Sequence, residues 1–348
     1  MPQLYGIQVL RAIAALMVAI HHVQADAGFL AARAGTAFTP SHALPWTAGV
    51  DLFFVISGFI MVHSSAGLFD RPDGARLFVA RRVARIVPLY WAATTLFLAV
   101  LLASPALVNS GAPSFAQIAA SYLFWPMPNA IGELQPIYSL GWTLNYEMLF
   151  YALFGLALFA PGRLVVPLVC AALAGLVAAQ LLAGPLPLPF GFWGQPIVLE
   201  FAAGMAAGLL RRKGLRLDGR LRWLMAAAGI ALFVIASGEG WAQTSWGAVA
   251  LRGPAALLLV TAAACGRNVT APSALVRALA LLGDASYALY LVHPFAMRAL
   301  REVFAHTAPS ATGLFIVLAL LAAVLAALVV YHGFERPMTK MLRRALRA

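Results

Sequence analysis

Long runs of apolar residues follow one another through this chain, and they constrain its fold more than any other feature. A helix needs roughly 20 apolar residues to cross a bilayer. The sequence predicts ten such helices, near residues 7–25, 47–66, 83–103, 139–159, 164–183, 195–211, 222–237, 247–265, 285–303 and 314–334. The runs are continuous rather than alternating, which excludes an outer-membrane β-barrel. We therefore predict an all-α, polytopic membrane bundle that forms a single domain over residues 1–348.

The composition supports this prediction. Hydrophobic residues make up 62% of the 348 residues and charged residues only 10%, whereas soluble domains carry roughly a quarter charged residues. A single soluble core of this length cannot bury so much apolar surface. This excludes a soluble enzyme, a disordered chain and a disulfide scaffold. The two cysteines, Cys170 and Cys265, lie inside apolar runs without metal-binding spacing, and we predict no metal site.

The net charge of +12 raises the question of nucleic-acid binding. The basic residues lie instead in alternate short loops, such as 66–85 and 211–222, and in the tail after residue 335. Residues 104–138, 184–194 and 238–246 contain no Lys or Arg. Because basic loops stay on the cytoplasmic side, this alternation predicts that both termini are cytoplasmic. The longest outer loop, 104–138, has a candidate interfacial helix over 114–125.

Ionisable residues inside apolar helices are costly and are therefore candidates for function. Arg11 and His22 are eleven residues apart on the first helix. This spacing returns to within roughly 20° of the same face and separates them by roughly 16 Å. One face thus offers a cation near the cytoplasm and a base further out, which suits a long ligand with an anionic head and a reactive far end. In the alternative interpretation, Arg11 anchors the helix and His22 makes a structural hydrogen bond.

Asp51 begins the second helix at a depth similar to that of His22. A carboxylate beside an imidazole fixes its tautomer and raises its basicity. The alternative is that Asp51 caps the helix N-terminus.

Arg82 and Arg85 share a face at the expected start of the third helix, with Arg81 beside them. Cations at a helix N-terminus suit phosphate binding. The alternative is plain anchoring at the cytoplasmic surface.

The later helices carry a further set of polar and aromatic residues, with His293 in mid-span and the others in the outer halves, and these are candidates for contacts to a sugar acceptor. The set is Trp142, Asn145, Glu147, Glu200, Arg252 and His293. Structural alternatives remain open. Arg252 is able to pair with Glu147 or with Glu200, and His293, which precedes a helix-kinking proline, is able to form an interhelical hydrogen bond.

Five segments in order carry a resemblance to a known family. They are Gln8–Ala15 with His22, Gly49–Phe59, Arg81–Trp91, Ser139–Glu147 and Ser286–Pro294. Each is weak alone, but the ordered set resembles the acyltransferase family 3 integral-membrane proteins, and most closely the ExoZ-like exopolysaccharide O-acetyltransferases. The resemblance covers Gly6 to about Pro337.

The resemblance implies transfer of an acyl group, usually acetyl, from cytoplasmic acyl-CoA to a carbohydrate hydroxyl at the outer face of the bacterial inner membrane. The acceptor would be an exopolysaccharide or its lipid-linked repeat unit. The R-x(10)-H pattern of the family falls on Arg11 and His22, and its R-x-x-R pattern on Arg82 and Arg85. We accordingly expect His22 to be the catalytic base and Asp51 its orienting acid, with acetyl-CoA held by Arg11, Arg81, Arg82 and Arg85.

Some family members carry a fused periplasmic esterase-like domain, which we do not expect here. Two other functions fit the same residues: a transporter or flippase for a lipid-linked saccharide, and a scaffolding subunit of a polysaccharide export complex. Neither would bind acyl-CoA. The sequence does not predict the oligomeric state.

Overall fold

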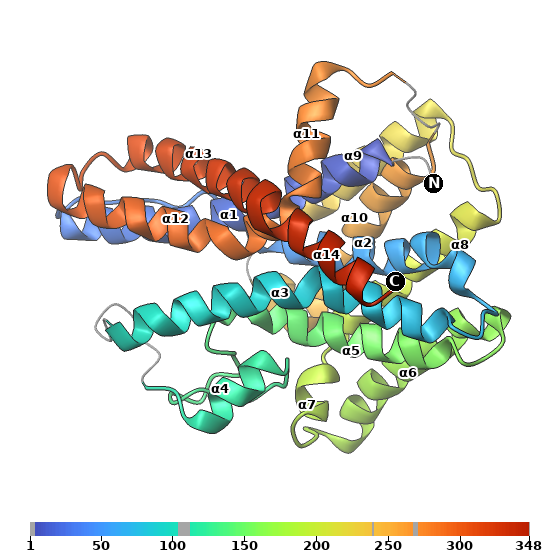
Figure 1. Cartoon of the computed structure of the whole chain (residues 1–348). Helices are drawn as coiled ribbons and strands as arrows, with labels where there is room; N and C mark the ends of the chain where they lie inside the picture. The colour runs from blue at the N-terminus through green and yellow to red at the C-terminus, as the bar shows by residue number, and fades with distance from the viewer. Residues whose placement is uncertain (1–3, 104–111, 239, 267–270, 348) are drawn as a thin grey trace. The chain divides into compact units, whose positions relative to one another are not determined.

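The computed structural model describes residues 4–103, 112–238, 240–266 and 271–347, and these form helices joined by turns with no strand among them (Figure 1). The all-α prediction is confirmed for this part of the chain. Residues 104–111 of the predicted outer loop lie outside it. The chain divides into two compact units: residues 1–59 with 203–333, and residues 60–202 with 334–348.

The first unit is built around the N-terminal helix. Its elements are α1 (Tyr5–Arg33), η1 (Trp46–Ala48), the first part of α2 (Gly49–Ser64), most of α8 (Leu199–Arg212), α9 (Gly219–Ala236), η6 (Gly240–Gln243), α10 (Ser245–Ala264), α11 (Ala274–Asp284), α12 (Ser286–Thr307), α13 (Thr312–Val330) and the start of the π-helical turn η7 (Tyr331–Glu335).

Small residues allow other helices to approach α1 closely. It contacts α10, α11, α12 and α13, and Figure 1 shows α12 and α13 lying along it. Ala12, Ala14 and Ala15 of α1 are fully buried. A Cβ atom on Gly49, the first residue of α2, would overlap the carbonyl oxygen of Ala14. The start of α2 therefore packs directly on the α1 backbone.

Helix α12 runs parallel to α1. Polar contacts join Arg11 to Ser286 near the start of both helices and Arg33 to Ala305 near their ends. Helices α11 and α12 meet at Ala285 with a bend of 75°. Pro294 lies inside α12, which stays helical through it.

The second unit contains the rest of α2, η2 (Ala66–Leu68), α3 (Gly74–Ala103), α4 (Phe115–Tyr122), η4 (Ser139–Gly141), α5 (Trp142–Ala157), α6 (Gly162–Ala183), α7 (Phe190–Trp193), η5 (Pro196–Val198), the first residues of α8, and α14 (Arg336–Ala345). Helix α5 packs on α3 and α6, and α14 packs on α3. Phe78 of α3 and Phe154 of α5 stack with ring centroids 4.9 Å apart. Aromatic packing therefore joins these helices.

Seven helical stretches are long and apolar enough to cross a membrane, and the bent pair α11–α12 forms an eighth candidate, among the described residues. Each of the ten predicted segments falls on a helix. Helices α5 and α8 are shorter, with 16 and 14 residues. The short helix predicted over 114–125 is α4. The chain is a multi-pass membrane protein.

One predicted boundary is wrong in a way that affects the site. Helix α3 begins at Gly74, not near residue 83, because the basic residues on this segment tolerate helix as readily as apolar ones do. Arg82 therefore lies two turns inside the helix. The dipole at the helix N-terminus therefore does not act on Arg82 as the sequence predicts, since that effect fades within the first turn.

Candidate functional site

The first unit brings together two histidines that lie far apart in the sequence. His22, in the middle of α1, is partly buried, and His293 of α12 is fully buried. Nδ1 of His22 lies 3.1 Å from Nε2 of His293, and the ring centroids are 5.0 Å apart. The parallel packing of α1 and α12 thus places two imidazoles in hydrogen-bond contact within a membrane-embedded helix pair.

Both rings also face backbone carbonyls of their own helices. Nδ1 of His22 lies 2.9 Å from the carbonyl oxygen of Val18, and Nδ1 of His293 lies 2.9 Å from that of Leu289. In each case the carbonyl belongs to the residue four positions earlier. These contacts fix the orientation of both rings relative to their helices.

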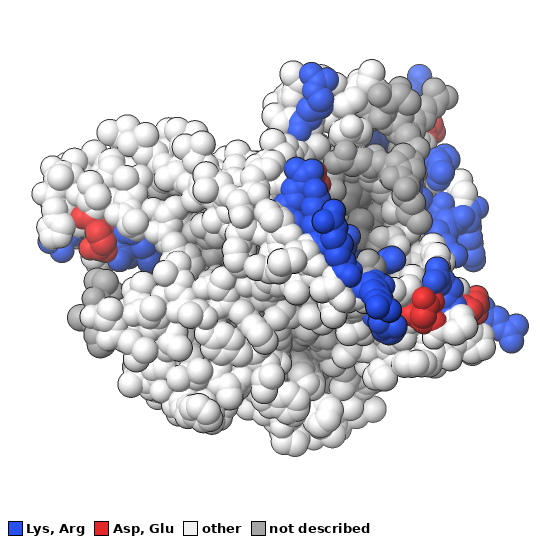
Figure 2. All heavy atoms as spheres, in the orientation of Figure 1, with Lys and Arg blue, Asp and Glu red and all other residues white. Residues whose placement is uncertain are grey.

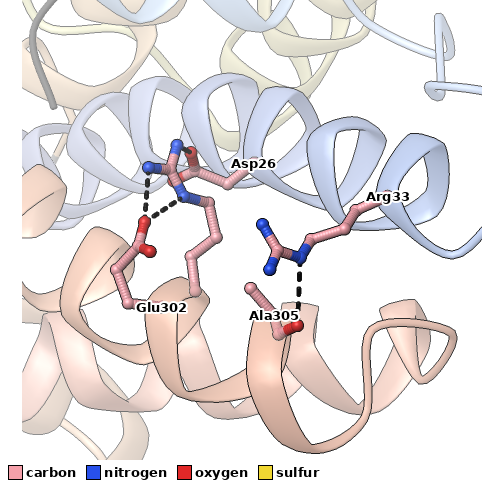
Figure 3. Close-up of polar contacts among 5 residues, drawn as sticks. Asp26, Arg33, Glu302 and Ala305 are labelled. Atoms are coloured by element: carbon pink, nitrogen blue, oxygen red, sulfur yellow. Dashed lines mark hydrogen bonds and ion pairs between the residues drawn. The ribbon is translucent and has the colours of Figure 1, made fainter. Parts of the chain in front are cut away.

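A second set of polar contacts joins the same two helices beyond the histidines (Figure 3). Arg301 of α12 binds Asp26 of α1 at 3.0 Å and its neighbour Glu302 at 2.8 Å. Its guanidinium also lies 4.5 Å from the ring centroid of Phe29. Figure 3 shows Arg33 of α1 reaching the Ala305 carbonyl further along. Together with the contact between Arg11 and Ser286 on the other side of the histidine pair, these contacts hold the register of α1 against α12.

Arg11 lies near the opposite end of this helix pair. Its Nη2 donates to Ser286 Oγ at 2.9 Å and its Nη1 to Gln8 Oε1 at 3.2 Å. These contacts help to position the guanidinium, and Ser286 is the first residue of α12.

Asp51 and Arg252 also belong to the first unit. Asp51 is 4% exposed in the first turn of α2, close to where Gly49 packs on Ala14. Arg252 of α10 donates to Thr47 Oγ1 at 3.1 Å and to Gln243 Oε1 at 3.2 Å. Arg252 thus joins α10 to the chain just before α2.

In the second unit, Arg82 lies over an aromatic surface. Its Cζ is 5.5 Å from the Phe78 ring centroid and 5.8 Å from that of Tyr151. Nη2 donates to Ser64 Oγ at 3.3 Å, while the buried Nε has no hydrogen-bond partner among the described residues. The guanidinium therefore keeps donor capacity that a ligand could use.

The C-terminal helix adds another arginine to this cluster. Arg343 of α14 is partly buried, and the charges of Arg81 and Arg85 act on it. Its buried Nε also lacks a hydrogen-bond partner in the part of the chain that is described. Figure 2 shows basic side chains running along α14. We call Arg81, Arg82, Arg85 and Arg343 the arginine cluster.

Glu147 lies close to this cluster. Tyr151, one turn further along α5, donates a hydrogen bond from its hydroxyl to the Glu147 carboxylate. The charge of Glu147 also acts on Arg82. Tyr151 is not among the residues predicted from the sequence, although its i, i+4 spacing from Glu147 indicates the contact.

The other candidates for acceptor binding lie around the start of α5 and α8. Trp142 packs edge-on against Tyr146 at 6.0 Å, and Tyr146 stacks on Phe192 at 4.3 Å. Asn145 is 2% exposed, and its Oδ1 has no hydrogen-bond partner among the residues described. Glu200 is buried in the first turn of α8.

Within the described ranges, no group of three or more His, Cys, Asp or Glu side chains could hold a metal ion.

Comparisons with known proteins agree with the ordered motifs. A family model described as an acyltransferase domain matches residues 4–332. The chain is 37% identical over 322 residues to the exopolysaccharide production protein ExoZ of Rhizobium meliloti, covering 87% of this chain and 92% of that protein. It is 28% identical over 327 residues to the acyltransferase MdmB of Streptomyces mycarofaciens, covering 86% and 79% of the two chains. No solved structure matches. The chain therefore belongs to the acyltransferase 3 family of membrane proteins.

Proposed function

We propose that this protein transfers an acyl group, most simply acetyl, from acyl-CoA to a carbohydrate hydroxyl outside the cytoplasm. The proposed acceptor is an exopolysaccharide or its lipid-linked repeat unit, at the bacterial inner membrane with both termini in the cytoplasm. The family membership and the similarity to ExoZ support this assignment. The observation that carries it is the oriented imidazole of His22 in the middle of α1, in contact with His293.

The proposed chemistry uses His22 as a general base. The acceptor O–H gives its proton to the imidazole while its oxygen attacks the thioester carbonyl. The C–S bond breaks, and the CoA thiolate takes the proton back from the imidazolium. The products are an O-acyl ester and free CoA thiol. In a two-step alternative, the imidazole of His22 first takes the acyl group as CoA thiol leaves, and the acceptor hydroxyl then takes the acyl group from the imidazole. We propose Asp51, buried in the first turn of α2 in the same unit, as the acid that stabilises the imidazolium.

The donor site that we propose is the arginine cluster. CoA carries a diphosphate and a phosphate monoester, and arginine binds phosphate oxygens with paired N–H donors. The buried Nε atoms of Arg82 and Arg343 supply such donors. Arg82 is also held against two aromatic rings, which reduces the entropy lost on binding.

The acceptor site that we propose lies around the start of α5. Sugars bind by stacking on aromatic rings and by hydrogen bonds from their hydroxyls. Trp142 supplies an aromatic surface, and the unpartnered Oδ1 of Asn145 supplies a buried acceptor. An unsatisfied buried polar atom costs about 1–3 kcal/mol, so its retention favours a ligand that donates to it. Glu147 and Glu200 complete the proposed polar set.

The experiment that tests this function is binding and transfer with purified protein in detergent. Acetyl-CoA should raise the unfolding temperature, because a ligand that binds only the native state stabilises it. Radiolabelled acetyl groups should then appear on an added polysaccharide. If the protein moves a saccharide across vesicle membranes and acetyl-CoA does not raise its unfolding temperature, the result would favour a flippase. Neither binding nor movement would favour a scaffolding role.

A further inference from the structure

The geometry points to His293 as a positioning residue that keeps His22 in the tautomer able to accept a proton. This inference rests on the proposed role of His22 and extends it. It differs from the acceptor-binding role that the sequence suggested for His293, because the ring is fully buried and its Nε2 faces His22 at 3.1 Å.

The tautomers follow from the carbonyl contacts. A carbonyl oxygen only accepts hydrogen bonds, so a ring nitrogen 2.9 Å from one carries the proton. Nδ1 of His293 therefore donates to Leu289 O. Full burial disfavours a charged ring, so Nε2 of His293 bears a lone pair. That lone pair is directed at His22.

The same rule fixes His22. Its Nδ1 faces Val18 O at 2.9 Å and the His293 lone pair at 3.1 Å. Nδ1–H is therefore shared between two acceptors, and the proton-free nitrogen is Nε2. In this tautomer, Nε2 of His22 is the atom that takes the proton from the acceptor hydroxyl. Without His293, one of the two hydrogen-bond acceptors that favour this tautomer is lost.

The contact gains strength during the reaction. When Nε2 of His22 accepts a proton, the ring becomes an imidazolium and its Nδ1–H becomes a stronger donor. The neutral His293 lone pair then stabilises the charged ring without adding a second charge. A buried imidazole thus performs the orienting function that a carboxylate performs in other general-base sites.

The first test observes the tautomer without relying on activity. Protein labelled with ¹⁵N-histidine contains seven histidines, and the His22 signals are identified by their loss in His22→Gln. We expect a protonated Nδ1 and an unprotonated Nε2 in the unliganded protein near neutral pH. In His293→Phe the Nε2–H tautomer should gain population. A wild-type His22 protonated at Nε2 alone would overturn the inference.

The second test uses kinetics with acetyl-CoA and a polysaccharide acceptor. His293→Phe should lower kcat by about 10- to 100-fold, the lower part of the range for general-base catalysis, with KM for both substrates little changed. His293→Gln places Oε1 near the former Nε2 and should restore much of the loss. The matched control is His306→Gln on the exposed end of α12, which should keep the wild-type kcat.

These outcomes separate His293 from the wider proposal. A raised acceptor KM at unchanged kcat would place His293 in acceptor binding instead. Equal kcat losses in His293→Gln and His293→Phe, with wild-type unfolding temperatures, would also overturn the positioning role. If instead no variant of His22 affected transfer, the proposed function of His22 would fail while the tautomer measurement still stood.

Discussion

Arg301 of α12 reaches across to α1, where its Nη1 lies 3.0 Å from Oδ1 of Asp26, one turn beyond His22. The two side chains are only 17% and 13% exposed. Arg301 has a second acidic partner in Glu302. The Asp26–Arg301 pair therefore joins the helices that carry the two histidines. If Asp26 is removed, Arg301 keeps Glu302 as an ion-pair partner, whereas if Arg301 is removed, Asp26 loses its ion-pair partner.

This difference predicts unequal effects on stability. Asp26→Asn leaves Arg301 paired with Glu302, whereas Arg301→Gln leaves Asp26 without its ion-pair partner in a mostly buried place. We expect Arg301→Gln to lower the free energy of unfolding by about 1–3 kcal/mol and Asp26→Asn to lower it clearly less. Unfolding temperatures of the two variants in detergent measure this. A larger loss in Asp26→Asn would contradict the geometry.

Close packing at the start of α2 gives a second prediction. Gly49→Ala would force a methyl group into the Ala14 carbonyl and displace α2 together with Asp51. Overpacking of this kind costs about 1–3 kcal/mol, and transfer activity should fall with it. Gly175→Ala is the control, because open space surrounds Gly175 on α6. An unaltered Gly49→Ala protein would show that α2 does not pack on α1 as described.

The arginine cluster predicts different roles for two adjacent arginines. Arg343 has a buried, unpartnered Nε, whereas Arg344 is exposed on the same helix. Arg343→Gln should weaken CoA binding about tenfold, equivalent to about 1.4 kcal/mol. Arg344→Gln removes the same charge and should change binding much less. Titration calorimetry with CoA compares them, and equal effects would indicate a general electrostatic attraction instead of a defined site.

Asn145 tests the proposed acceptor site. Because its Oδ1 has no partner among the described residues, replacing the side chain should affect folding little. We expect Asn145→Ala to raise the KM for the polysaccharide about 5- to 20-fold, the loss of about one buried hydrogen bond, at unchanged KM for acetyl-CoA. Steady-state kinetics with each substrate varied in turn gives both values. A change in the KM for acetyl-CoA alone would place Asn145 in the donor site instead and contradict its role in acceptor binding.

The helices could be predicted from the sequence because continuous apolar runs leave few alternatives in a membrane. Ends were harder to predict. Helix α3 extends back to Gly74 through Arg76 and Arg81, since arginine is a good helix former and carries no stop signal. The bend at Ala285 also escaped prediction, because the neighbouring Pro294 was the stronger local signal for a kink.

Within the site, residues on one helix were predictable and contacts between helices were not. The shared face of Arg11 and His22 follows from helical periodicity. The contact between His22 and His293 depends on the parallel packing of α1 and α12, which are separated by most of the chain. The sequence places Arg343 only in the basic tail, since nothing in it indicates that α14 packs on α3.

The central claim is that His22 accepts the proton from the acceptor hydroxyl during acyl transfer. The most direct measurement is transfer of labelled acetyl from acetyl-CoA to a polysaccharide by purified wild-type and His22→Ala proteins, with CoA binding measured alongside. The account predicts that His22→Ala still binds CoA and loses transfer by about 10²- to 10⁴-fold. Transfer at the wild-type rate by His22→Ala would contradict it.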